Sequence, residues 1–309
     1  MATLDLLVLG DCNPDLVLAG GNVEPAFGQV ERIVEHAELV VGGSGSITAC
    51  GAARLGLRTA LAGVVGDDLF GRFMVDALTE RGVGVSGIVV DREQATGISV
   101  VLVRGEDRAI LTALGTIETF SVDRVDLALL RSARHVHVSS FFLQHRLRPG
   151  LEALLSEARA AGATTSVDPN WDPNWDSGEE GDGGLFDVLA ATDILLLNAE
   201  EAKRIAGEAD VEDAVRTLAQ HCPTVVVKLG ADGALALADG LLVRAAGLTV
   251  SPVDTVGAGD SFNAGFLTGF LAGHPLEQSL ELAVACGSLS TRAAGGTAAQ
   301  PTLAEAMSA

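Results

Sequence analysis

The chain has 309 residues and a formal net charge of −21, because 41 Asp and Glu residues outnumber 20 Lys and Arg residues. A protein that binds nucleic acid or anionic lipid needs a basic face, and the few basic residues form no cluster. Apolar residues make up 48% of the chain, with 37 glycines and only 4% aromatic residues. These values exclude a disordered chain and argue against nucleic-acid and membrane-surface partners. They predict a globular protein with a large core.

The opening segment MATLDLLVLG carries no positive charge, since the first basic residue is Arg32, and its apolar run is too short for a signal peptide or a membrane span. The four cysteines are far apart and none has a Cys-x-x-Cys spacing. This pattern is typical of reduced, buried thiols. We therefore expect a cytoplasmic protein.

Short apolar runs alternate with segments of helical period along most of the chain, which is the pattern of βαβ units. The expected strands are 4–10, 59–64, 135–139, 164–168, 193–197 and 224–229, and the expected helices are 46–55, 67–81, 150–161, 199–206, 211–221, 260–273 and 276–294. The sequence therefore predicts an α/β fold with a doubly wound, mainly parallel sheet flanked by helices. We expect a single domain over residues 1–309.

Two regions, about 15–42 and 87–113, interrupt this alternation. They contain consecutive strand patterns with no helix between them, as in GISVVLVR followed by RAILTALG. We expect these strands to pair with one another in a small separate sheet.

The stretch from Asp254 to Asp260 reads DTVGAGD and leads directly into a helix-forming run. The backbone N–H groups of Gly257, Ala258 and Gly259 would point into open space at a helix N-terminus, which is an anion-binding site. Small side chains there let a phosphoryl group approach the main chain. Asp260 has two interpretations, a general base beside the anion hole and a plain N-cap of the helix.

Three segments together resemble the ribokinase-like, or PfkB, carbohydrate kinases. They are GGSGSITACGAARLG at 42–56, VVGDDLFG at 64–71 and DTVGAGDSFNAGF at 254–266. The resemblance implies a ribokinase-like fold whose two extra strand regions form a small β lid. It implies an ATP-dependent phosphotransferase with an alcohol group as acceptor, which transfers the γ-phosphoryl group to a hydroxyl of a small sugar or sugar-like substrate. Asp260 would be the catalytic base, and the three small residues before it would hold the phosphoryl group.

The same resemblance places substrate-binding residues in the first part of the chain. Asn13 and Asp15 match positions that contact substrate hydroxyls, although an Asn-Pro turn also explains them. Gly42 and Gly43 would bring the main chain against the sugar. Ser46 stands where many relatives carry Asn, so one substrate hydrogen bond would be shortened, replaced or lost.

Asp168 and Asn170 match further substrate-binding positions at the carboxyl end of an expected strand. Ligands bind at such strand ends in open α/β sheets. The family often has an Arg soon after this Asn, whereas this chain has Asp172. This departure weakens the interpretation that the substrate is phosphorylated or acidic.

The resemblance also implies a nucleotide site with Mg²⁺. The residues it places at the nucleotide are Asn198, Lys228, Gly230, Gly233 and Asp254, with Glu201 on the metal side. Asn198 and Glu201 also fit a capping box at a helix start, and the two roles are compatible. The segment 228–233 also fits a plain hairpin turn.

The resemblance implies ATP and Mg²⁺ as cofactors, leaves a monovalent cation such as K⁺ open, and implies a homodimer formed through the lid. Two alternatives to a sugar kinase stay open: a nucleoside kinase of the same fold, and a non-catalytic sugar- or nucleotide-binding protein. His135 and His137, two apart on one expected strand, fit either a metal site or strand packing. No third ligand has a spacing that would complete a metal site.

Overall fold

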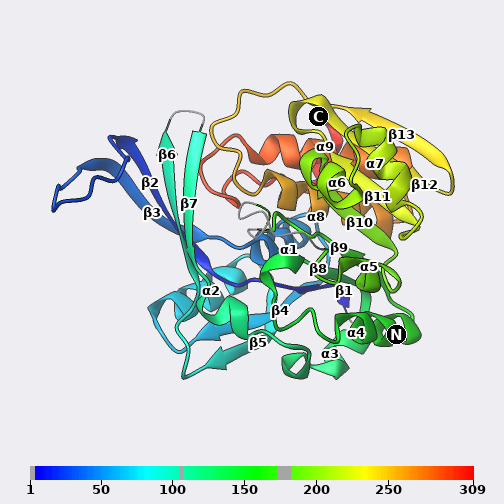
Figure 1. Cartoon of the computed structure of the whole chain (residues 1–309), viewed down its shortest axis with the longest axis horizontal. Helices are drawn as coiled ribbons and strands as arrows, with labels where there is room; N and C mark the ends of the chain where they lie inside the picture. The colour runs from blue at the N-terminus through cyan, green and yellow to red at the C-terminus, as the bar shows by residue number, and fades with distance from the viewer. Residues whose placement is uncertain (1–3, 105–106, 173–174, 176–181) are drawn as a thin grey trace.

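The computed structural model describes residues 4–104, 107–172, 175 and 182–309, and Figure 1 shows their arrangement. The strands are β1 (Leu4–Leu9), β2 (Pro14–Gly21), β3 (Val34–Val41), β4 (Thr59–Gly66), β5 (Gly84–Asp91), β6 (Ile98–Arg104), β7 (Asp107–Ala113), β8 (Ala133–Val138), β9 (Thr164–Val167), β10 (Ile194–Asn198), β11 (Thr224–Lys228), β12 (Gly233–Ala238) and β13 (Leu241–Ala246). The helices are α1 (Ser44–Arg54), α2 (Leu69–Glu80), α3 (Leu127–Ser132), α4 (Leu151–Ala160), α5 (Leu185–Leu189), α6 (Ala199–Ala206), α7 (Val211–Leu218), α8 (Ala258–Leu271), α9 (Leu276–Ser290) and α10 (Leu303–Met307).

The large sheet has nine strands in the order β13-β12-β11-β10-β9-β8-β1-β4-β5. The strands from β11 to β5 are parallel, and β12 and β13 extend the sheet at one edge as antiparallel strands. From β1 the chain adds strands on one side through β4 and β5, and on the other side through β8. This reversal places a topological switch point at β1, where ligands bind in open α/β sheets.

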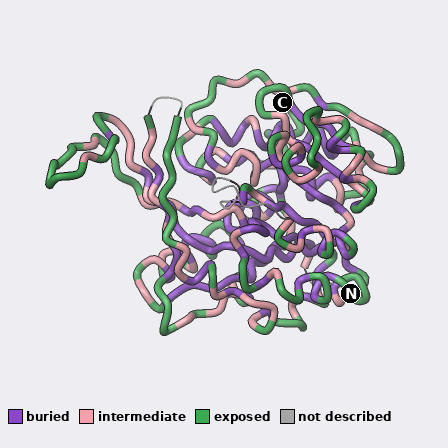
Figure 2. Tube along the Cα trace, viewed as in Figure 1, coloured by how far each residue is buried: buried purple, intermediate pink, exposed green. Residues whose placement is uncertain are grey.

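Helices cover both faces of the large sheet, so its strands are buried on both sides. In β1, Leu7 and Leu9 pack into one core layer with residues of α4 and α7. Leu6 and Val8 pack into the opposite layer with residues of α1, α8 and α9. Burial on both faces explains why the predicted strands are continuous apolar runs rather than alternating ones. Figure 2 shows this buried trace through the middle of the molecule, and the predicted doubly wound α/β fold is confirmed.

The predicted helices and strands all occur, with shifts at their ends. The helix expected from residue 260 begins two residues earlier, at Ala258, and the helix expected over 276–294 ends at Ser290. The latter is followed by the glycine pair at 295–296, which favours a turn over further helix. In the part of the chain that the structure describes, no helix combines the length and the apolar character needed to cross a membrane.

Four strands from the two interrupting regions form the small sheet, in the order β3-β2-β6-β7. Strands β2 and β6 are parallel, and the other neighbours are antiparallel. The structure differs from the expected boundaries at 87–91, which belong to β5 at the edge of the large sheet. The reason is that β4, α2 and β5 form a crossover unit, which pairs β5 with β4 in parallel. The small sheet extends away from the large sheet in Figure 1.

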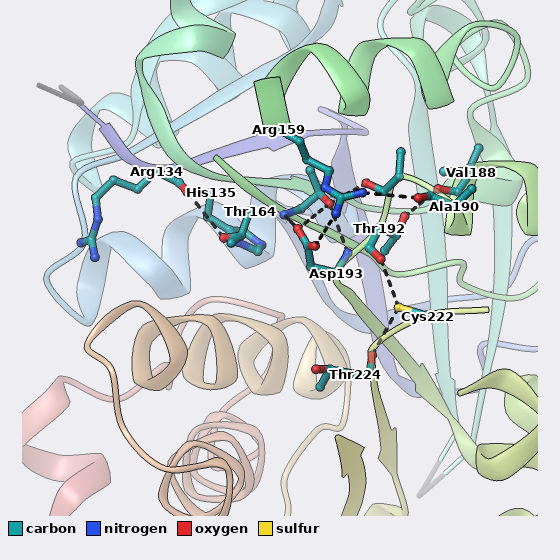
Figure 3. A network of polar contacts seen from close by, with 12 residues as sticks. Arg134, His135, Arg159, Thr164, Val188, Ala190, Thr192, Asp193, Cys222 and Thr224 are labelled. Carbon is teal, nitrogen blue, oxygen red and sulfur yellow. Dashed lines mark hydrogen bonds and ion pairs between the residues drawn. The ribbon is translucent and has the colours of Figure 1, made fainter. Parts of the chain in front are cut away.

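Polar contacts fix the amino ends of the central parallel strands (Figure 3). Asp193, just before β10, accepts a hydrogen bond from Thr165 N at 2.8 Å, and its carboxylate lies 3.4 Å from Arg159 Nη2 of α4. Cys222 Sγ donates to the Thr192 carbonyl at 3.5 Å. These contacts hold the register of strands whose opposite, carboxyl ends carry the polar side chains described below.

His135 and His137 lie on β8 and are fully buried. His135 Nε2 and His137 Nδ1 each lie 2.7 Å from Ser166 Oγ, and His135 Nδ1 lies 2.7 Å from Thr164 Oγ1. Burial lowers the pKa of His135 to about 3 and the pKa of His137 to about 4, so both rings are neutral at pH 7. These contacts confirm the strand-packing interpretation of the histidine pair.

Candidate active site

A cavity of about 610 Å³ lies at the carboxyl ends of the parallel strands, between the large sheet and the inner face of the small sheet. It gathers residues from the loop after β1, the N-termini of α1 and α8, and the ends of β9, β10 and β11. The predicted site residues that line it are Asn13, Asp15, Gly43, Asp168, Asn170, Asn198, Glu201, Lys228, Gly230, Gly257, Gly259 and Asp260. Segments almost 250 residues apart in the sequence therefore meet at one place.

Five of the predicted site residues are not among the residues that line the cavity, namely Gly42, Ser46, Gly233, Asp254 and Ala258. Ser46 is fully buried and its Oγ donates to the Asp11 carbonyl at 3.1 Å, so its hydroxyl holds the loop instead of facing a ligand. A Cβ on Gly42 would overlap the carboxylate of Asp15, so this glycine makes room for that side chain rather than for a sugar.

Helix α8 begins with an open N-terminus at the cavity. Gly257 is its N-cap with φ +69°, a conformation that favours glycine. Asp260 is the third helical residue, so its interpretation as the N-cap is wrong. The Ala258 N–H donates to the Thr255 carbonyl at 3.3 Å, whereas the N–H groups of Gly259 and Asp260 have no acceptor within the described residues. These donors and the helix dipole make the start of α8 a candidate anion hole.

The carboxyl group of Asp260 lines the cavity beside this anion hole. Ser44, the first residue of α1, lines the same cavity, so the N-termini of two helices lie close to this carboxyl group. Burial, and then the Asp168 carboxylate, raise the pKa of Asp260 well above its usual value. A raised pKa makes a carboxylate a stronger proton acceptor, which suits a general base.

The loop after β1 supplies polar groups at the other end of the cavity. Burial, and then the nearby Asp11 carboxyl group, raise the pKa of Asp15 to about 7. Asn13 Nδ2 lies 3.5 Å from Ser99 Oγ of the small sheet. Asn13 Oδ1 is buried and has no hydrogen-bond partner among the described residues. A substrate hydroxyl would satisfy this acceptor.

Asp11 was not predicted as a site residue. It accepts hydrogen bonds from Ser44 N at 3.0 Å and Gly45 N at 2.8 Å, so it caps α1 from the preceding loop. Its Oδ2 also accepts a hydrogen bond from Ser140 Oγ at 3.3 Å, and Asn170 Nδ2 donates to the same hydroxyl at 3.3 Å. Asp11 therefore connects the loop after β1 with those after β8 and β9.

An ion pair lies on the strand side of the cavity. Lys228 Nζ donates to Asp168 Oδ2 at 2.8 Å and to Asn263 Oδ1 at 3.3 Å, and Asn263 Nδ2 donates to the same Asp168 oxygen at 2.6 Å. Burial alone would raise the pKa of Asp168, but the Lys228 ammonium group holds it below its usual value. Asn263 was not predicted. The Asp-x-x-Asn spacing from Asp260, which puts both side chains on one helix face, is the signal that points to it.

The predicted capping box is confirmed: Glu201 N donates to Asn198 Oδ1 at 2.9 Å, and Asn198 N donates to Glu201 Oε2 at 2.8 Å. Burial, and then the Asp168 carboxylate, raise the pKa of Glu201 to about 7. The predicted hairpin turn is also observed, since Leu229 N donates to the Gly233 carbonyl at 2.8 Å between β11 and β12.

The small sheet reaches the loop before α8 through Arg108 of β7, which was not predicted. Arg108 Nη1 donates to Thr255 Oγ1 at 2.7 Å and lies 4.0 Å from Asp254 Oδ1. Asp254 in turn accepts hydrogen bonds from Val256 N and Gly295 N, each at 2.9 Å. The structure thus places Asp254 as a loop-holding residue and Arg108 as a contact between the two sheets.

A buried carboxyl group with a raised pKa, main-chain donors without an acceptor at the start of α8, and the unpartnered Asn13 Oδ1 thus lie around one cavity. The pfkB family carbohydrate kinase model matches residues 3–303, and the chain belongs to this family. The protein is an ATP-dependent sugar kinase.

Similar proteins span nearly the whole chain. A fructokinase from Klebsiella pneumoniae is 34% identical over 272 residues, which cover 84% of this chain and 88% of that protein. An ATP-dependent ribose-1-phosphate kinase from Halopiger xanaduensis is 31% identical over 303 residues, which cover 95% and 94%. A crystal structure of a putative ribokinase II from E. coli with ATP and Mg²⁺ has a TM-score of 0.87 at 24% identity, covers 99% of this chain and 98% of that chain, and shows the shared fold.

Proposed function

We propose that the enzyme transfers the γ-phosphoryl group of ATP to a hydroxyl of a small sugar or sugar-like substrate, with Asp260 as the catalytic base. One observation carries this proposal: Asp260 shares a cavity with Asp15 at one end and with the N–H donors of α8 beside it. An alcohol is a poor nucleophile, so a kinase must hold its oxygen in line with phosphorus and accept its proton.

The substrate end of the cavity would be formed by Asn13, Asp15, Gly43 and Asn170. The Asp15 carboxylate and the unpartnered Asn13 Oδ1 would accept hydrogen bonds from sugar hydroxyls. A Cβ on Gly43 would lie 2.8 Å from Asn13 Oδ1, so glycine leaves this acceptor free. Asp168 contributes through its ion pair with Lys228, which fixes the strand ends around the substrate.

The transfer forms a bond between the substrate oxygen and the γ-phosphorus and breaks the bond from that phosphorus to the bridging oxygen. The electron pair of the broken bond leaves with ADP, and the hydroxyl proton goes to Asp260. The main-chain N–H groups of Gly259 and Asp260 would stabilise the charge on the equatorial oxygens, because they are fixed before the reaction begins. The loop 228–230 would lie against the nucleotide.

The oxygen atoms that line the cavity suit an Mg²⁺ ion that is held mainly by phosphates and water. Glu201 lines the cavity, and the capping bond occupies only its Oε2. Within the described residues, no group of three or more His, Cys, Asp or Glu side chains is arranged to hold a metal ion. Glu201 and Asn198 would therefore orient the water shell, and the bound Mg²⁺ would neutralise phosphate charge. The assay of ADP release described below, run with and without K⁺, tests whether the enzyme requires a monovalent cation.

The charge of the cavity favours an uncharged acceptor. Its walls carry the carboxyl groups of Asp11, Asp15, Asp168, Glu201 and Asp260, and among the described lining residues only Lys228 and Arg108 oppose them. A phosphorylated or acidic substrate would meet this excess of acidic groups. Relatives of this chain are named fructokinase and ribose-1-phosphate kinase, and the acidic lining favours the uncharged sugar of the first name over the phosphorylated sugar of the second.

A nucleoside kinase is a second candidate, favoured by the inner face of the small sheet. Val101, Ile110, Ile117 and Leu143 give the cavity an aliphatic wall that a base could contact. The lining residues that the structure describes include no aromatic side chain for stacking, which favours the sugar. Nucleosides therefore belong in the same substrate screen.

The small sheet would act as a lid that excludes water, which suppresses hydrolysis of ATP.

We also propose that the exposed tip of the small sheet forms a homodimer, because Phe27 and Ile33 between β2 and β3 are 98% and 84% exposed. Sedimentation velocity tests this assembly. A cytoplasmic location fits the four free, buried cysteines and the use of ATP.

A coupled assay of ADP release over pentoses, hexoses, sugar acids, sugar phosphates and nucleosides tests the function. We expect ADP release that depends on one class of neutral sugar. Asp260→Asn should lower kcat by about 10³-fold with the melting temperature preserved, because the base is lost and the shape is kept. A folded Asp260→Asn enzyme with wild-type kcat would remove Asp260 from the mechanism, and the absence of ADP release with every acceptor would favour a binding protein.

A further inference from the structure

The chain contains only two lysines, Lys203 and Lys228. Lys203 lies on α6 and pairs with Glu200 at the surface. Lys228 ends β11, and its side chain is only 14% exposed and lines the cavity. Lys228 is paired with Asp168, but a buried ion pair gains little net stability over apolar residues of similar size, so the position of Lys228 calls for a functional explanation.

The ammonium group of Lys228 lies against the anion hole. A Cβ on Gly259 would lie 3.5 Å from Lys228 Nζ, and the N–H of Gly259 is one of the donors that lack an acceptor in the described chain. A phosphoryl group bound to these donors would therefore lie within reach of Nζ. The absence of a side chain at Gly259 keeps the space between them open.

Lys228 stays charged in this position. Burial alone would lower its pKa, but the carboxylates of Asp168, Glu201 and Asp260 around it raise the pKa above the usual value. Of the three N–H donors of an ammonium group, two are used within the described residues, on Asp168 Oδ2 and Asn263 Oδ1. One donor remains for a ligand in the cavity.

We propose that Lys228 is a further catalytic residue, whose third N–H donates to an oxygen of the phosphoryl group as it passes from ATP to the substrate. This inference rests on the proposed function. Lys228 keeps all three protons, because the proton of the alcohol goes to Asp260. Its contribution is electrostatic: Asp168 and Asn263 hold the charge in place, so no reorganisation is needed when negative charge develops on the phosphoryl oxygens.

Two simpler roles make different predictions. If Lys228 only neutralises the buried Asp168, its loss lowers stability and leaves kcat unchanged in the folded enzyme. If it only binds ATP, its loss raises KM for ATP and leaves kcat unchanged. A donor to the transferring phosphoryl group lowers kcat.

The first experiment compares Lys228→Met, Lys228→Arg and the surface control Lys203→Met in steady-state assays with the acceptor that the screen identifies. We expect Lys228→Met to lower kcat by about 10²–10³-fold with KM for ATP within about threefold, as for loss of one transition-state donor. Lys228→Arg should recover part of this loss, and Lys203→Met should match the wild type. A folded Lys228→Met enzyme with kcat within threefold of wild type would overturn the proposal.

The second experiment remains informative if Lys228→Met does not fold. Wild-type enzyme labelled with ¹³Cε-lysine gives two signals, and Lys203→Met assigns them. Addition of aluminium fluoride, a mimic of the transferring phosphoryl group, to the enzyme with MgADP and acceptor should shift the Lys228 signal and leave the Lys203 signal in place. An unchanged Lys228 signal would overturn the proposal. If the wild type releases no ADP with any acceptor, the proposed function itself fails; an active wild type with either negative result defeats only the role of Lys228.

Discussion

At the scale of single residues, the cavity divides its carboxyl groups into two kinds. Asp15, Glu201 and Asp260 have raised pKa values because burial, reinforced by neighbouring carboxyl groups, disfavours their ionised forms. Asp168 has a lowered pKa because Lys228 is bonded directly to it. One lysine therefore favours the ionised form of one carboxyl group, whereas burial favours the protonated forms of its neighbours. Such a separation of pKa values assigns different roles to similar side chains.

Asp15 should make sugar binding depend on pH. Its pKa of about 7 means that Asp15 is mostly protonated at pH 6 and mostly ionised at pH 8, and only the ionised form accepts hydrogen bonds with both oxygens. We expect KM for a neutral sugar, measured at saturating MgATP, to fall by about tenfold from pH 6 to pH 8. Asp15→Asn should have a high KM with no such dependence, and a slope that persists in Asp15→Asn would assign the titration to another group.

At the scale of elements, periodicity and apolar runs were sufficient to predict every helix and strand named from the sequence, because these signals are local. The run LDLLVL of β1 predicts a buried strand without knowledge of its neighbours. The start of α8 was harder to place, since Gly257 with its positive φ takes the cap position that Asp260 could also fill. The crossover that puts β5 in the large sheet depends on pairing with β4, which no local pattern reports.

The candidate site could be predicted only where a motif is contiguous. The DTVGAGD stretch and the Asn198–Glu201 capping box are local, so their residues were found. The ion pair between Asp168 and Lys228 joins positions 60 residues apart, and it depends on the sheet register. Ser46 matched a family position but its hydroxyl bonds the main chain, because the side chain is too short and too buried to reach the cavity.

Arg108 on strand β7 offers a test of how the small sheet contributes to sugar binding and to the exclusion of water. Removal of the Arg108 guanidinium in Arg108→Leu would break its hydrogen bond to Thr255 and weaken the contact between the two sheets. The bond is charge-assisted but partly exposed, so we expect a loss of about 1 kcal/mol, or roughly a fivefold rise in KM for the sugar. ADP release without sugar should also rise, because water would enter more often.

The matched control for this test is Arg104→Leu on the neighbouring strand β6. Arg104 lies 3.8 Å from Asp107 at the surface, with 69% of its side chain exposed, so its loss should leave KM and the sugar-independent ADP release unchanged. Equal effects of the two substitutions would mean that the contact of Arg108 with Thr255 has no special role.

At the scale of the whole molecule, the charge of −21 opposes the binding of MgATP, which is itself anionic. The local positive features are the N-terminus of α8, Lys228 and the metal that accompanies the nucleotide. They act over a few ångströms, whereas the field of the surface carboxylates acts over longer distances. The enzyme thus binds anionic MgATP at a site with local positive charge, although the electrostatic field of the whole protein is negative.

Salt should separate these two contributions. The Debye length falls from about 30 Å at 10 mM ionic strength to about 8 Å at 150 mM, so added salt screens the distant carboxylates more than the contacts at α8 and Lys228. We expect KM for ATP to fall several-fold over this range at constant free Mg²⁺. KM for a neutral sugar should stay within about twofold and serves as the internal control. A rise in KM for ATP with salt would instead mean that local attraction dominates, and that the net charge of the chain has little influence on how the nucleotide binds.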